Sequence, residues 1–346
     1  MNNNRIPSLD GLRAISILLV MTSHWSYAHG FASLANLGDL GVRVFFVISG
    51  FLITGLLLRE LEAGGRIDLL KFYFRRTLRI FPAYYFFLLV FAGLAAAGRL
   101  LISFKQFLPA LTYTSNYFFP GAWELDHAWS LAVEEQFYLI YPGILAFCGR
   151  RRTLRLLAGV LVAAPFVRLL DHQLFGEAQA IWLTKGFHAN VDSLAAGCLL
   201  AFLRGRLHAS AVYLRVLKSP LLFLLPIAVV FVNEQIDYRH LDLGLFHSLN
   251  NLLIALLIDW AVTNFDRNPF GRLLNTRILA FVGAMSYSIY LWQQPFLNPG
   301  PPSRFFEMPS AAVGLVFFSL FSYFVIEKYF LARRAVWEKR IFRGND

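Results

Sequence analysis

Apolar stretches of about 20 residues follow one another along almost the whole chain, separated by short polar or basic segments. A helix that rises 1.5 Å per residue needs about 20 apolar residues to cross the hydrocarbon core of a bilayer. By this criterion the pattern predicts spans over residues 10–29, 40–60, 80–98, 129–148, 153–170, 187–205, 219–235, 246–264, 278–296 and 309–331. The expected fold class is therefore all-α, a polytopic membrane helical bundle with about ten transmembrane helices.

One apolar stretch, Gln106 to Phe119, fits this pattern less well. It is short, and Pro109, Asn116 and Pro120 interrupt or end it, so we interpret it as a re-entrant or interfacial segment. The spans and their connections take up nearly all of the sequence. We therefore expect a single integral-membrane domain over residues 1–346, with no fused soluble domain, and no cleaved signal peptide.

The basic residues predict the orientation in the membrane. With ten spans and a cytoplasmic N-terminus, about 25 of the 32 Lys and Arg residues fall on the cytoplasmic side. The seven on the other side are Arg43, Arg99, Lys105, Arg168, Lys185, Arg239 and Arg304. Cytoplasmic loops of membrane proteins carry an excess of positive charge, so we expect both termini in the cytoplasm.

Composition supports a membrane protein and excludes other classes. The chain is 57% hydrophobic and 15% charged, whereas soluble domains contain about 25% charged residues. The net charge of +11 could suit nucleic acid, but the basic residues adjoin apolar runs, so we expect no nucleic-acid partner. Cys148 and Cys198 lie in apolar runs without metal-site spacing, which predicts buried thiols and no metal.

The first polar cluster inside a predicted span consists of Arg13 and His24. Eleven residues bring a helix back to within about 20° of the same face, about 16 Å further along its axis. Ionisable groups within a span are costly in lipid and usually face a polar interior with a function. Each residue alone would fit a helix-end anchor or a satisfied core histidine, but the two together favour a functional site.

The second cluster is the run from His127 to Tyr138. His127 and Glu134 are seven residues apart and would share a helix face with Ser130 near it, whereas Glu135 points about 100° away and is interpreted as a spectator. A His–Glu couple makes a good general base, because the carboxylate orients the imidazole and stabilises its charged form. A structural buried polar network is the alternative.

The third cluster, Arg75, Arg76 and Arg79, lies at the predicted cytoplasmic start of a span. Arg75 and Arg79 are four residues apart and share a face. The planar guanidinium group makes two-point contacts with phosphate, so the cluster predicts an anionic cytoplasmic ligand. The alternative is ordinary positive-inside charge.

These clusters and several other motifs, in the same order, resemble the acyltransferase-3 family of integral-membrane O-acyltransferases. The motifs are Arg13-X10-His24, Gly41 to Phe51, Arg75-Arg76-X-X-Arg79-Ile-X-Pro82, His127-X-Trp129-Ser130-Leu-X-Val-Glu134-Glu-Gln-Phe-Tyr, Phe187 to Gly197 with Asp192, Ser286-Tyr-Ser-Ile-Tyr290-Leu-Trp292, and Ser322 to Glu327. The resemblance covers roughly residues 5–330. Three positions depart from the family pattern: Gln293 replaces a frequent His, Lys328-Tyr329 replaces a frequent Pro, and the usual Arg shortly before Asp192 is missing, with His188 or Asn190 nearby.

The resemblance implies transfer of an acyl group, often acetyl, from cytoplasmic acyl-CoA to a hydroxyl of a carbohydrate, a lipid-linked glycan or a small molecule, in the bacterial cytoplasmic membrane. It implies catalytic roles for His24, Glu134 and His127, and donor binding by Arg13, Arg75, Arg76 and Arg79. Further pocket candidates are Trp129, Ser130, Asp192, Ser286, Tyr290 and Gln293. Acyl-CoA would be a co-substrate, with no permanently bound cofactor. Direct transfer and a covalent acyl-histidine route both stay open.

The rival interpretation is a transporter or flippase for a glycan or a small metabolite. Such a protein also needs buried Arg, His and Glu for a substrate path or a proton relay. The sequence shows no inverted repeat and no paired broken helices of the kind that mark many transporters. We therefore favour the enzyme.

Overall fold

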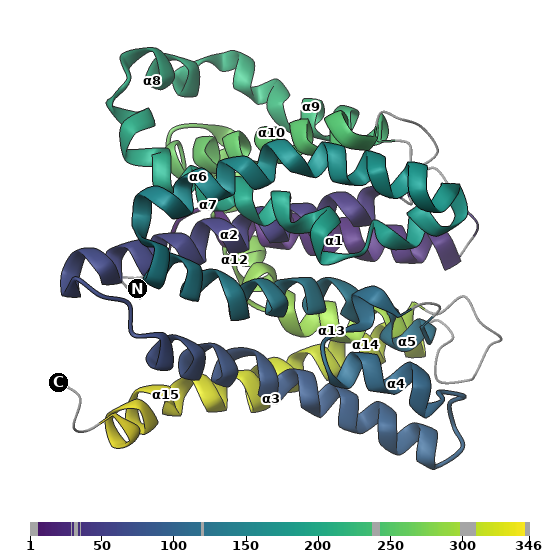
Figure 1. Ribbon diagram of the computed structural model, residues 1–346. Helices are drawn as coiled ribbons and strands as arrows, with labels where there is room; N and C mark the ends of the chain where they lie inside the picture. Colours follow the sequence, from purple (N-terminus) through teal and green to yellow (C-terminus); the bar gives the residue numbers. More distant parts are fainter. Residues whose placement is uncertain are drawn as a thin grey trace. The chain divides into compact units, whose positions relative to one another are not determined.

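Every regular element in the described part of the chain is a helix, which confirms the all-α fold class (Figure 1). The computed structural model describes residues 6–28, 30, 34, 36–118, 121–236, 243–297 and 309–342. Its helices belong to two compact units. The first unit contains Met1–Gly65 and Phe147–Ser286, and the second contains Arg66–Ala146 and Tyr287–Asp346.

The first unit is built mainly from long helices that pack around an aliphatic core. Its elements are α1 (Leu9–Ala28), α2 (Asn36–Gly64), the later part of α6 (Ala128–Leu183), α7 (Phe187–Ala209), α8 (Ala211–Lys218), a 3-10 turn (Pro220–Leu224), α9 (Leu225–Glu234), α10 (Leu243–Thr263), α11 (Pro269–Leu274) and α12 (Arg277–Ala284). The core lies where α1, α2, α7 and α10 meet, and fully buried Val47, Ile48, Ile254 and Ile258 belong to it.

Glycines allow the helices of the first unit to approach each other closely. A Cβ on Gly50 of α2 would lie 2.0 Å from the Leu194 carbonyl oxygen, and a Cβ on Gly197 of α7 would lie 2.0 Å from the Val47 carbonyl oxygen. Each helix thus presents a glycine to the backbone of the other. Such small-residue crossings are how membrane helices gain packing where lipid offers no hydrophobic driving force.

The second unit combines one long helix pair with shorter elements. Its elements are α3 (Leu69–Ala96), α4 (Phe104–Leu111), a 3-10 turn (Ser115–Tyr117), α5 (Trp123–Asp126), the early part of α6, α13 (Ser286–Phe296), α14 (Ser310–Phe321), a π-helical segment (Ser322–Glu327) and α15 (Lys328–Ile341). Helix α15 packs along α3 (Figure 1). Aromatic rings fill the interior, with Trp292 stacked on Phe318 and edge-on to Phe87.

The predicted count of ten spans is not confirmed. Five of the described helices are long and apolar enough to cross a membrane, or six if α8 and the helical stretch Pro220–Glu234, bent by 56°, form one span. Predicted spans 129–148 and 153–170 both lie in α6, which breaks at Gly149, where φ is 73°. Predicted span 278–296 is divided between α12 and α13, and α7 matches 187–205 but carries several polar side chains.

Several other expectations can be compared with the structure. Helix α4 has 8 residues, too short for a span of about 20 residues, so it agrees with a re-entrant or interfacial segment. Both cysteines are free thiols, as expected, but only Cys198 is buried and Cys148 is exposed. Six residues that the sequence predictions use lie outside the described residues: Arg5, Phe119, Pro120, Arg239, Arg304 and Arg343.

Candidate active site

Arg13 and His24 lie on one continuous helix, α1, as the sequence predicted. Both side chains are half-buried. The Arg13 Nη1 atom lies 3.4 Å from Asp10 Oδ1 in the preceding turn. A Cβ on Gly283 of α12 would lie 1.7 Å from the Asp10 carbonyl oxygen, so α12 fixes the backbone that carries this pair. The helix thus presents a cation near its start and an imidazole in its last turns on the same face.

Asp192 is the centre of a buried polar network in the first unit. It is fully buried, and its two carboxylate oxygens accept hydrogen bonds from Arg168 Nη1 at 3.1 Å and Nη2 at 3.0 Å. Ser248 donates to Asp192 Oδ2 at 2.9 Å and Asn251 at 3.1 Å. Although the sequence has no arginine shortly before Asp192, a guanidinium group reaches this carboxylate from Arg168, 24 residues earlier in the chain.

The network extends across five helices of the first unit. Arg43 of α2 donates to Asn233 of α9 at 3.1 Å, and Ser193 of α7 donates to Asn251 of α10 at 2.9 Å. The set of side chains buried in it comprises Arg43, Arg168, Asp192, Ser193, Asn233, His247, Ser248, Asn250 and Asn251. Buried polar groups are tolerated in a membrane only when they are paired, so this network ties the helices together.

The three arginines of the third cluster have different environments in the second unit. Arg75 donates from Nε to Glu338 Oε2 at 2.9 Å and from Nη2 to Glu338 Oε1, which is a two-point ion pair with α15. Arg79 is exposed. Arg76 lies with its guanidinium carbon 3.5 Å from the centre of the Tyr138 ring. The three arginines that the sequence grouped together therefore lie on one helix in different surroundings.

Arg76 also faces two carboxylates. Its Nη2 atom lies 4.0 Å from Glu134 Oε2, and its Nε atom lies 3.9 Å from Glu135 Oε1. Both distances exceed the usual hydrogen-bond range of 2.7–3.2 Å, so these ion pairs are loose. Glu135, interpreted from the sequence as a spectator, therefore lies as close to Arg76 as Glu134 does.

His127 precedes α6 and caps the end of α5. It is buried, and its ring meets Phe87 and Tyr290 edge-on, with centroids 5.5 Å apart in each case. The Tyr290 hydroxyl donates to the His127 carbonyl oxygen at 3.1 Å and is hydrogen-bonded to Ser130. The structure thus brings His127, Ser130 and Tyr290 together, while Glu134, two helical turns further on, faces Arg76.

The remaining pocket candidates are distributed between the units. Trp129 is half-buried near the start of α6. Ser286 and Gln293 on α13 are both buried. Ser286 ends the first unit, and Gln293 belongs to the second. Arg13, His24 and Asp192 belong to the first unit, and the arginine cluster, His127 and Glu134 belong to the second.

Sequence reasoning missed a second charged cluster in the first unit. Fully buried Asp259 of α10 accepts from Arg204 Nε at 2.7 Å and from Tyr213 at 2.8 Å, and it lies 2.9 Å from His208 Nε2. This carboxylate joins the ends of α7, α8 and α10. An Asp within an apolar run was the signal that could have found it.

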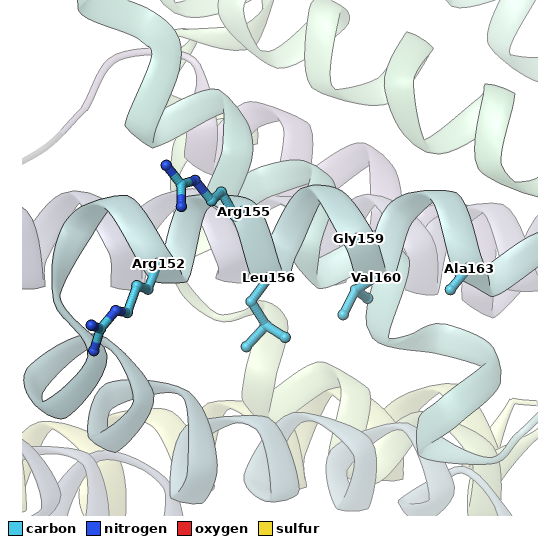
Figure 2. A pocket seen from close by; sticks show the side chains of 6 residues that line it. All are labelled: Arg152, Arg155, Leu156, Gly159, Val160 and Ala163. Carbon is cyan, nitrogen blue, oxygen red and sulfur yellow. The ribbon is translucent and has the colours of Figure 1, made fainter.

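A surface depression follows the later part of α6, with a volume of about 590 Å³ (Figure 2). Arg152 and Arg155 lie at one end, and the rest of its lining consists of Leu156, Gly159, Val160 and Ala163. None of these residues is a predicted site residue. The depression lies on the stretch that follows the Gly149 break, where the sequence places a basic run beside an apolar one.

Long apolar helices with buried, paired charges define a multi-pass helical membrane protein. Residues 6–328 match the acyltransferase domain, and the chain belongs to the acyltransferase-3 family. It is 31% identical over 316 residues to the O-acetyltransferase OatA of Staphylococcus aureus, covering 84% of this chain and 50% of that protein. It is 27% identical over 334 residues to the peptidoglycan O-acetyltransferase OatA of Listeria monocytogenes, covering 86% of this chain and 50% of that protein.

The chain thus spans about half the length of the curated relatives it matches. No solved structure gives a significant match.

Proposed function

We propose that this chain is a membrane O-acyltransferase that moves an acyl group, most simply acetyl, from acyl-CoA to a hydroxyl of a carbohydrate or lipid-linked glycan. The observation that carries the proposal is the Arg13-X10-His24 pair on one continuous helix in a chain that belongs to the acyltransferase-3 family. Two relatives are named O-acetyltransferases, one of them for peptidoglycan, which supports an acetyl group and a cell-wall glycan.

In the proposed reaction His24 is the general base. It removes the proton of the acceptor hydroxyl as the oxygen attacks the thioester carbonyl. The new C–O ester bond forms, the C–S bond breaks, and the proton passes from His24 to the departing CoA sulfur. Atoms and charge balance without another reactant, so positioning of the donor and the acceptor supplies much of the rate enhancement.

The donor phosphates would meet guanidinium groups. In the second unit Arg76 is the better candidate, because its ion pairs, at 3.9–4.0 Å, are longer than hydrogen bonds. In the first unit the candidate is Arg13, which makes one long hydrogen bond of 3.4 Å to Asp10. A guanidinium group held in place but not fully hydrogen-bonded can take up a phosphate with little rearrangement. Tyr138 would hold Arg76 in position through its ring face.

The test uses purified protein in proteoliposomes with acetyl-CoA labelled in the acetyl group and a lipid-linked glycan extract. Transfer of label into an alkali-labile ester on the glycan, with release of CoA, supports the proposal. Flux of a solute or glycan across the bilayer without ester formation would instead support the transporter. Mass spectrometry of cell-surface glycans with and without the protein then identifies the acceptor.

A further inference from the structure

Glu338 occupies the guanidinium fork of Arg75 in the way that a phosphate group would. We propose that Glu338 is an internal placeholder for an anion: a phosphate-bearing ligand binds Arg75 by displacing this carboxylate. The inference rests on the proposed function in one respect, since the ligand would be the diphosphate part of the acyl-CoA donor. It adds a residue that controls donor affinity from the C-terminal helix.

The geometry of the pair is the basis of the inference. Two nitrogen atoms of Arg75, Nε and Nη2, donate to the two carboxylate oxygens of Glu338. This side-on, two-point arrangement is also how guanidinium groups bind phosphate oxygens. The side chains of Arg75 and Glu338 are 38% and 18% exposed, so a ligand can reach the pair and water weakens it.

The charges around the pair favour exchange for a phosphate. Glu338 is the one acidic residue among residues 328–341, which contain five basic residues: Lys328, Arg333, Arg334, Lys339 and Arg340. On α3, Lys71 lies four residues before Arg75 and Arg79 lies four after it, so the three cations follow one helix face. Asp68 lies 3.7 Å from the Lys71 Nζ atom, so rotation of Glu338 away from Arg75 would leave a surface on which basic side chains still outnumber acidic ones.

Helix α15 does not depend on the ion pair alone for its position. The ring of Phe342, which is buried, meets Phe74 of α3 edge-on with centroids 5.7 Å apart. The Lys71 Nζ atom lies 5.9 Å from the centre of the same ring. These contacts hold the end of α15 against α3, so release of Arg75 needs a change in the Glu338 side chain and not the departure of the helix.

The first experiment measures binding of inorganic pyrophosphate and of CoA by calorimetry with the purified full-length protein at low salt. An exposed ion pair shifts an equilibrium by about two- to fivefold, and a ligand that must displace it loses that factor in affinity. Glu338→Gln should therefore bind both probes about two- to fivefold more tightly, and Arg75→Ala should bind both more weakly. Glu62→Gln is the matched control, because Glu62 also forms an exposed ion pair, with Arg150 in the first unit, and it should bind like the wild type.

The second experiment exchanges the two residues in the variant Arg75→Glu with Glu338→Arg, which keeps an ion pair between α3 and α15. A purely structural pair predicts wild-type affinity in this variant and no gain in Glu338→Gln, and either result with a folded protein would overturn the proposal. An anion placeholder predicts weaker pyrophosphate binding in the exchanged variant. Because pyrophosphate binding needs no acyl transfer, a tighter Glu338→Gln protein without any transferase activity would refute the proposed function and leave the anion site in place.

Discussion

Breaking the ion pair between Arg168 and Asp192 tests whether the buried network holds the first unit together. The two side chains are 2% and 0% exposed, and the carboxylate also accepts hydrogen bonds from Ser248 and Asn251. Asp192→Leu removes the counter-charge and leaves the guanidinium group of Arg168 buried. Among the described contacts, the Arg168 guanidinium group then keeps its hydrogen bonds to the Ala189 carbonyl oxygen at 2.8 Å and to the Ser248 hydroxyl at 2.6 Å.

The expected loss of stability depends on two free-energy costs, that of a lost hydrogen bond and that of an unpaired buried charge. Single hydrogen bonds between membrane helices average about 0.6 kcal/mol, because the unfolded state in the membrane also finds partners. Removal of one member of a buried ion pair costs about 3–5 kcal/mol, since it leaves an uncompensated charge. The charge effect is larger, so we expect Asp192→Leu to lower the free energy of unfolding by about 3–5 kcal/mol.

The assay is a double-mutant cycle by SDS titration of the purified protein in mild detergent. Arg168→Leu should cost about as much as Asp192→Leu, and the double variant should cost clearly less than the sum of the two, because no buried charge is left. Arg155→Leu, an exposed change on the same helix, serves as the control. A cost below about 1 kcal/mol for Asp192→Leu, or strict additivity in the double variant, would refute the reasoning.

Three further outcomes are expected. His24→Ala should lower acyl transfer by about 10²–10⁴-fold with the protein still folded in the membrane, and near-normal turnover would contradict its role as the base. Gly50→Leu should abolish folded protein, because a Cβ at this position would lie 2.0 Å from the Leu194 carbonyl oxygen. Gly205→Leu should be tolerated, because nothing lies within 4 Å of a Cβ there, and equal yields of folded protein for the two variants would contradict this prediction. A cysteine placed after Arg343 should resist an impermeant reagent applied outside whole cells, and its labelling would refute a cytoplasmic C-terminus.

The all-α class of the fold could be predicted because apolar length is a local property, whereas the predicted count of ten spans is not confirmed. The Gly149 break falls in the basic stretch where the sequence separated two predicted spans. The sequence does not predict how a span is divided: α12 ends at Ala284 and α13 begins at Ser286, inside one apolar run. Helix caps and close crossings decide such breaks, and they depend on partners elsewhere in the fold.

Spatial relations within the candidate site could be calculated from the sequence only for residues that lie on one helix. The relation between Arg13 and His24 follows from the helical repeat alone. The partner of Arg75 lies 263 residues away, and that of Arg168 lies 24 residues away on another helix. Nothing local in the sequence relates these pairs. The helical angle between Glu134 and Glu135 likewise did not show that Arg76 lies within about 4 Å of both.

The three arginines of α3 read as one phosphate-binding group in the sequence, but their partners make them unequal. Two of the three guanidinium nitrogens of Arg75 donate to Glu338, so a phosphate that replaced this carboxylate would gain only the difference in free energy between two similar ion pairs. Arg76 is held over Tyr138 with both carboxylates beyond hydrogen-bond distance, so a phosphate would add contacts that the free protein lacks. In the proposed donor site a phosphate would therefore gain more from Arg76 than from Arg75, and Glu338 would set how large that difference is.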